Sequence, residues 1–85
     1  MVEIEFLRWL TSVGIFDQQT PYHNTFDPIR GFWGYEEEHG SKVIVIYDGS
    51  FNELHCFMVD EYFKDRVDEY RKEISKSFEL QLDLT

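Results

Sequence analysis

The sequence has little from which to build a covalent or metal-held scaffold. Its single cysteine, Cys56, has no partner for an internal disulfide and is expected to be a small buried hydrophobe between His55 and Phe57. The three histidines, His23, His39 and His55, show no metal-ligand spacing. No run approaches the roughly 18 apolar residues of a membrane span. The N-terminus lacks the basic and apolar regions of a signal peptide, so the sequence predicts a cytoplasmic protein.

Basic residues are also scarce. Eight lysines and arginines stand against seventeen aspartates and glutamates, which gives a net charge of −9. Most of the acids lie late in the chain, since residues 36–85 hold thirteen acids and six bases. Such a charge repels nucleic acid and anionic membranes and attracts basic surfaces. The expected partner is therefore a basic protein, itself nucleic-acid-binding, with no direct contact to nucleic acid or membrane.

The composition favours one folded domain, residues 1–85. With 42% hydrophobic and 18% aromatic residues, the chain is too apolar for a disordered acidic tail. Residues 16–30 contain both prolines and show no periodicity, so they are expected to form one long loop. Its aromatic residues Phe16, Tyr22 and Phe26 either pack on the core or face a partner.

Hydrophobic periodicity predicts two helices. In residues 2–13 the apolar side chains recur at helical spacing, and Gly14 supplies a helix-ending cap. Residues 60–77 are expected to form the second helix, with Asp60 as N-cap. The apolar face of this second helix comprises Phe63, Val67, Tyr70, Ile74 and Phe78.

Between the helices, β-rich stretches alternate with turns at residues 39–41 and 48–49 and predict a three-stranded antiparallel meander. The tail, residues 78–84, alternates apolar and polar side chains, which is typical of a short fourth strand at a sheet edge, in this chain or in a neighbour. The expected fold class is α+β, in two layers and in the order α-β-β-β-α-β. The chain is then a monomer or, if the tail is exchanged, a homodimer.

The sequence offers no catalytic constellation. His55 and Cys56 are neighbours on a predicted strand, so their side chains point to opposite faces and cannot form a thiol-imidazole pair there. No phosphate-cradling glycine loop is present. We therefore expect no enzyme activity, no catalytic residue, no cofactor and no bound metal.

The strongest candidate for a binding surface is the exposed face of the second helix. It carries the carboxylates of Glu61, Asp65, Asp68, Glu69 and Glu73. Four of them repeat every four residues, and each like-charge step costs an isolated helix about 0.2–0.5 kcal/mol. Lysines in the same stripe relieve part of this repulsion. Two interpretations stand: an ordinary solvated face, or a row of carboxylates about 6 Å apart that imitates a phosphate backbone.

A second acidic cluster ends the first strand of the meander, at Glu36, Glu37 and Glu38. Consecutive strand residues point to alternate faces, so no more than two of these side chains act together. They either protect an edge strand against aggregation or extend the binding surface.

In size, charge and predicted α/β meander, the chain resembles the small acidic inhibitors that phages make against host nucleic-acid enzymes, such as anti-CRISPR proteins and uracil-DNA glycosylase inhibitors. It is equally similar to acidic immunity proteins and antitoxins that plug nuclease toxins. The resemblance covers these general properties and no specific residues. It implies an inhibitor that acts by DNA mimicry. The alternative expectation is a structural or assembly module that binds through the C-terminal strand and the aromatic loop.

Overall fold

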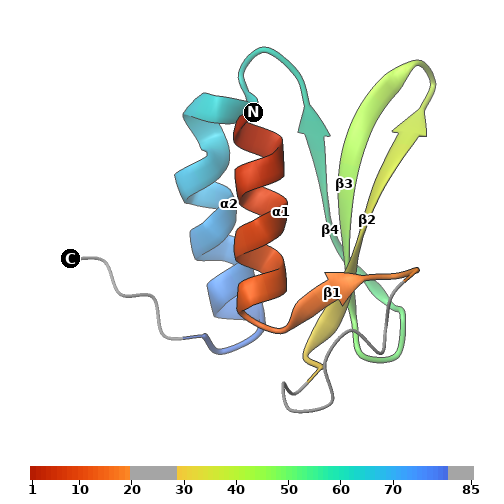
Figure 1. Ribbon diagram of the computed structural model, residues 1–85, viewed down its shortest axis with the longest axis vertical. Helices are drawn as coiled ribbons and strands as arrows, with labels where there is room; N and C mark the ends of the chain where they lie inside the picture. Colours follow the sequence, from red (N-terminus) through yellow and green to blue (C-terminus); the bar gives the residue numbers. More distant parts are fainter. Residues whose placement is uncertain (20–28, 81–85) are drawn as a thin grey trace.

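Two helices lie on one face of a four-stranded sheet in the computed structural model, which describes residues 1–19 and 29–80 (Figure 1). The elements in chain order are α1 (Val2–Ser12), β1 (Ile15–Asp17), β2 (Gly31–Glu38), β3 (Ser41–Asp48), β4 (Glu53–Val59) and α2 (Phe63–Ser77). The strands are ordered β1-β2-β3-β4; β1 runs parallel to β2, and the other neighbours are antiparallel. Neither described helix is long and apolar enough to cross a membrane.

The β2–β3 hairpin is closed by a two-residue turn. His39 and Gly40 both have positive φ, 52° and 80°, and the flanking residues Glu38 and Ser41 are paired. Two successive residues of positive φ give a turn whose twist matches that of the strands. The two strands are therefore paired without interruption up to this turn, from Gly31 opposite Asp48 to Glu38 opposite Ser41.

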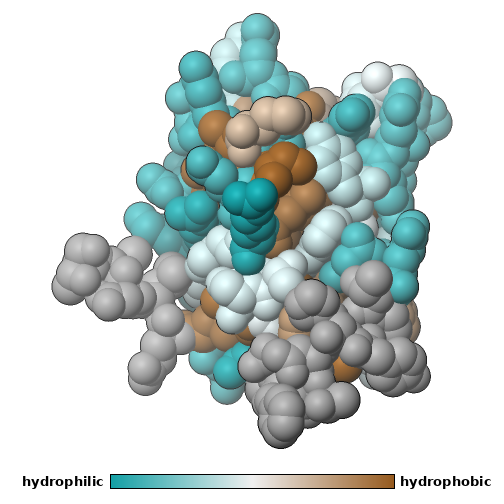
Figure 2. Space-filling model, in the orientation of Figure 1, coloured by the Kyte–Doolittle hydropathy of each residue, from teal (hydrophilic) through white to brown (hydrophobic). Residues whose placement is uncertain are grey.

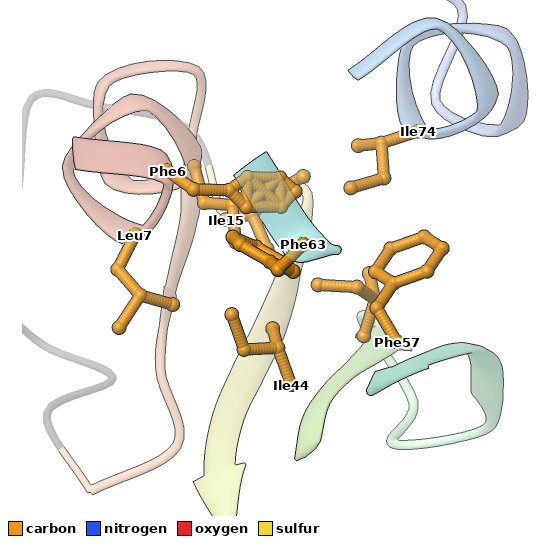
Figure 3. Close-up of a cluster of buried hydrophobic side chains, with 9 residues drawn as sticks. Phe6, Leu7, Ile15, Ile44, Phe57, Phe63 and Ile74 are labelled. Atoms are coloured by element: carbon orange, nitrogen blue, oxygen red, sulfur yellow. The ribbon is translucent and has the colours of Figure 1, made fainter. Parts of the chain in front are cut away.

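The core lies between the sheet and the two helices, with Phe6 of α1 at its centre (Figure 3). The Phe6 ring contacts Phe57 of β4 and Phe63 of α2 edge-on, at centroid distances of 6.2 and 5.6 Å. Phe6 is fully buried, as are Ile44 of β3 and Ile74 of α2. One aromatic side chain thus joins all three structural units, and its burial and edge-on contacts favour this single packing arrangement.

The predicted α+β class is confirmed: the described chain has an N-terminal helix, an antiparallel meander and a C-terminal helix. The predicted apolar face of α2 is also confirmed. Phe63 and Ile74 are buried, and the remaining members of the face pack against the core half-buried: Val67, Tyr70 and Phe78.

Residues 78–80 do not begin the strand that the alternation predicted. Residues 78–80 end α2: Glu79 has a φ of 54°, and Leu80 donates its N–H to the Ser75 carbonyl at 2.7 Å. This is the geometry of a Schellman cap, in which the apolar residue after the left-handed position folds back on the helix. Apolar residues two positions apart, such as Phe78 and Leu80, are compatible with this cap as well as with a strand. The alternation therefore could not distinguish the two structures. Residues 81–85 of the predicted strand lie outside the described residues.

The fourth strand is β1, at one edge of the sheet, and its last two residues fall in the segment expected to be a loop. Ile15 and Phe16 are buried, and β1 pairs with the start of β2. Three residues are too few to show a period, and their pairing depends on a strand that begins fourteen residues after β1 ends. Tyr22 and Phe26 of the predicted loop lie outside the described residues.

The start of α2 also differs from the prediction. The helix begins at Phe63, and the Asp60 carboxylate accepts the N–H of Tyr62 at 2.9 Å, so it caps the turn before the helix. Asp60 still serves a hydrogen-bonding role, because an aspartate binds the backbone two residues on in a turn as readily as at a helix start. Glu61 therefore precedes the helix.

Candidate protein-binding surface

The acidic stripe of α2 lies in solvent but is interleaved with bases. Asp65, Asp68, Glu69 and Glu73 are all exposed. The helix carries these four acids and five bases: Lys64, Arg66, Arg71, Lys72 and Lys76. The structure thus leaves α2 with a small net positive charge. A mixed face of this kind is typical of a solvated helix and does not present the single-sign field of a phosphate backbone.

The excess negative charge of the described chain is carried mainly by the sheet and its turns. Residues 31–59 hold five acids against a single base, Lys42. Three of the five are Glu36, Glu37 and Glu38, at the free end of the β2–β3 hairpin. They are the longest run of consecutive acidic residues in the sequence, and Lys42 is the one base opposite them on the hairpin.

The hairpin carboxylates divide between the two faces of the sheet. Tyr35 pairs with Ile44, a core residue, so odd positions of β2 point to the helices and even positions point away. Glu36 and Glu38 therefore share the outer face, while Glu37 lies on the helix side, paired with Lys42. The prediction that at most two of them act together agrees with this register.

The outer face of the sheet combines apolar side chains with this charge. Glu36, Val43 and Met58 form one row across it, and the next row includes Val45 and Cys56. Cys56 is exposed on this face, contrary to the expectation of burial, because β4 is an edge strand and both described helices lie on the other side of the sheet.

The surrounding carboxylates affect the pKa of the Cys56 thiol. Partial burial raises the pKa of the Cys56 thiol, and the charges of Glu38, Glu53 and Glu36 raise it further. The thiol is therefore protonated at neutral pH. His55 is on the opposite face, where its Nε2 lies 2.8 Å from the Ser77 hydroxyl, so the register separates the imidazole from the thiol.

An apolar pocket opens between α1 and β2. It has a volume of about 340 Å³ and is lined by Ile4, Leu7, Arg8, Thr11 and Trp33. The indole Nε1 of Trp33 donates a hydrogen bond to the Thr11 hydroxyl at 3.3 Å, which fixes the Trp33 ring against α1. Figure 2 shows apolar surface in the middle of the face that carries α1, bordered by hydrophilic surface on both sides.

Sequence reasoning missed this pocket. The available signal was Ile4 itself, an apolar residue outside the core face of the helix and, in the structure, 38% exposed. Single exposed apolar residues are common on protein surfaces, so Ile4 by itself could not identify the pocket from the sequence.

The hydroxyl of Tyr35 lies near α1 at the hairpin end. Burial raises the pKa of the Tyr35 hydroxyl, and the Glu3 carboxylate raises it further. The Lys42 ammonium lies 5.5 Å from the centre of the Tyr35 ring. Glu3 thus adds negative charge to the helix side of the hairpin.

The described residues contain no cluster of three or more histidine, cysteine, aspartate or glutamate side chains with the geometry of a metal site. What these surfaces offer is recognition: carboxylates, an apolar pocket and a strand edge. Comparisons with protein-family models, with curated proteins and with solved structures returned no match.

Proposed function

We propose that the protein binds a basic protein, one whose surface otherwise accommodates nucleic acid, and inhibits it by occupying that surface. The observation that carries the proposal is the position of the charge. Five acids and one base occupy residues 31–59, and Glu36, Glu37 and Glu38 follow one another at the end of one hairpin, two on the outer face and one on the helix side. A local field of one sign attracts a basic surface and speeds the encounter with it.

The hairpin is a better candidate than the helix for this contact. Its carboxylates lie on a paired strand closed by a tight turn, so little backbone entropy is lost when a partner engages them. On α2 a basic partner meets the lysines and arginines of the helix along with its carboxylates. Asp65, Asp68, Glu69 and Glu73 therefore form the second face to test, with Glu61 beside it.

The test compares two triple variants with equal loss of charge. One replaces Glu36, Glu37 and Glu38 by glutamine, and the other carries Asp65→Asn, Asp68→Asn and Glu69→Gln. Each immobilised protein captures binders from native host lysate, and the captured protein is identified. We expect a basic protein that is released by salt, displaced by double-stranded DNA, lost with the hairpin variant and retained by the α2 variant.

Inhibition is measured on the captured protein, by its nucleic-acid binding or cleavage with increasing amounts of this chain. Equal capture by both triple variants, or capture that neither salt nor DNA disturbs, would contradict charge mimicry at the hairpin. Loss of capture with the α2 variant alone would move the contact to the helix.

A further inference from the structure

Among the described residues, strand β2 is paired along its whole length on one side and only at its start on the other. β3 pairs with Gly31–Glu38, whereas β1 pairs with Gly31–Trp33. Gln18 donates its N–H to the Trp33 carbonyl at 3.1 Å, at the end of β1. Figure 1 shows β1 beside the lower part of β2 only. Within residues 1–19 and 29–80, no strand pairs with the second half of β2 on this side, so that half is an open edge.

The backbone groups that face the open edge follow from the ladder. In a strand, the N–H and C=O of alternate residues point to the same side. Because the Trp33 carbonyl faces β1, the N–H and C=O of Tyr35 and Glu37 face the open edge, and those of Gly34 and Glu36 face β3. The edge therefore offers a row of backbone donors and acceptors of the kind that an added strand pairs with.

The apolar pocket lies beside this edge. Trp33 and Tyr35 point to the helix side of the sheet, and Trp33 forms one wall of the pocket. The exposed side chain of Ile4 on α1 lines the same pocket. A strand added to the edge would alternate its side chains, so every second one would point toward the pocket and the others toward the outer face.

Charge selects the occupant. The outer face of the edge carries Glu36 and Glu38, and the Glu3 carboxylate of α1 acts electrostatically on the Tyr35 hydroxyl on the helix side. A second copy pairing edge to edge about a two-fold axis would bring these glutamates of two chains together, and like charges on paired strands are destabilising. A strand with apolar side chains on one face and basic side chains on the other matches both the pocket and the glutamates.

We propose, building on the proposed function, that the basic partner contributes an extended segment that adds to β2 as a strand. Its backbone pairs with Tyr35 and Glu37, its apolar side chains enter the pocket at Trp33 and Ile4, and its lysines or arginines reach Glu36 and Glu38. The segment continues the row of β1 along the rest of β2. Affinity then comes from backbone pairing and apolar burial as well as charge.

The probe is a short end-capped peptide in which lysine alternates with leucine. Two control peptides accompany it: one of the same composition with the lysines grouped in a block, and one with glutamate in place of lysine. Binding is followed by tryptophan fluorescence and by amide hydrogen exchange of the intact protein. We expect only the alternating basic peptide to bind and to protect the Tyr35 and Glu37 amides, with little change at Gly34 and Glu36, which are already paired with β3.

Two pairs of variants test the contact itself. Glu37→Pro removes an N–H that faces the open edge and costs no bond to β3, and Glu37→Gln removes the same charge but keeps the N–H. Ile4→Gln removes apolar pocket lining, and Ile29→Gln changes an isoleucine of similar exposure, 43% against 38%, that does not line the pocket. We expect Glu37→Pro and Ile4→Gln each to weaken binding about tenfold or more relative to its control.

Tight binding of the grouped peptide without protection of Tyr35 and Glu37 would overturn strand addition and leave charge-based binding of a basic protein intact. Binding of no peptide, or equal affinities within each variant pair, would also overturn it. Protection of the same amides in the protein alone, rising with its concentration, would make a second copy the occupant and overturn the basic segment. The capture experiment with the hairpin and α2 variants judges the proposed function independently.

Discussion

At the scale of single residues, the turns of this protein accept backbone strain that local contacts offset. Among the described residues, His39, Phe51 and Glu79 have positive φ although none is glycine. This conformation costs an L-residue about 1–2 kcal/mol. For Phe51 the compensation is visible, because its ring stacks on Phe32 at a centroid distance of 4.3 Å, with the planes 7° from parallel. Side-chain packing therefore stabilises the loop between β3 and β4 in addition to its backbone hydrogen bonds.

Asp48 organises that loop. Its carboxylate accepts the N–H groups of Ser50 and Asn52 at 2.8 and 2.9 Å and the Asn52 side-chain amide at 3.1 Å. The Asn52 backbone and side-chain hydrogen bonds, and then that of Ser50, lower the pKa of Asp48 in the folded protein. A carboxylate with a lowered pKa stabilises the fold above its unfolded pKa, about 3.9, and this contribution is lost as pH falls through the folded pKa.

We predict that Asp48→Asn reduces the loss of stability between neutral pH and about pH 3, because asparagine retains an acceptor but does not titrate. The measurement is urea unfolding at a series of pH values. Asp65→Asn removes an equal charge from the exposed face of α2, outside the loop, and serves as the control. An acid dependence that Asp48→Asn leaves equal to that of the wild type would contradict the role of the loop hydrogen bonds.

At the scale of elements, α2 is the helix whose sequence most directly specifies its place. Its apolar residues fall on one face, and the side chains of Phe63 and Ile74 on that face are buried in the core. The Tyr70 ring stacks on Phe57 of β4 at a centroid distance of 4.1 Å, so the middle of the helix also contacts the sheet. The helix is thus held by aromatic contacts at its start and its middle and by an isoleucine near its end.

We predict that Ile74→Ala costs about 2–5 kcal/mol and Phe63→Ala about 3–5 kcal/mol of unfolding free energy, because each leaves a cavity at a fully packed site. Since these losses approach the whole stability of a small domain, Ile74→Val, at about 0.5–1.5 kcal/mol, provides a variant that stays folded. Glu73→Ala, at an exposed position of the same helix, should stay within about 0.5 kcal/mol of the wild type. Denaturant titration measures all four, and equal midpoints for Ile74→Val and Glu73→Ala would contradict the packing.

At the scale of the whole molecule, the net charge of −9 acts on the fold as well as on partners. The carboxylates of residues 31–59 lie on one sheet with a single base among them, so they repel one another in the folded state. The five bases of α2 balance the acids of the helix but belong to another layer. Self-repulsion of this kind lowers the stability of the compact state and is screened by salt.

We predict that sodium chloride stabilises the protein. Between about 0.01 and 1 M salt the Debye length falls from about 30 to about 3 Å, and relief of roughly 1 kcal/mol of repulsion would raise the Tm by about 4–8 °C. The glutamine variant at Glu36, Glu37 and Glu38, with a net charge of −6, should gain less. A Tm that falls with salt would show that ion pairs outweigh the repulsion. Thermal unfolding followed by circular dichroism makes the comparison.

Much of this fold is encoded locally. Neighbouring residues specify α1 and α2 through their 3.6-residue periodicity. They also specify the meander, through its β-rich stretches and the His39–Gly40 turn. The same reading identified Phe63 and Ile74 as core residues and Glu36 to Glu38 as a cluster divided between two faces. Local patterns indicate which face of an element is buried. They do not indicate which other element that face packs against.

What the sequence alone determined is therefore the two helices, the meander between them, the apolar faces of the helices and the sign of the charge. Only the tertiary structure decided that β1 pairs with the start of β2 and stops at Asp17, because a three-residue pairing depends on a distant strand. It also placed Ile4 of α1 beside Trp33 of β2, and it separated the balanced charge of α2 from the unbalanced charge of the hairpin. The pocket combines residues of α1 with Trp33 of β2, and the open edge and its glutamates belong to the same strand, so they become one surface through packing of the helix on the sheet.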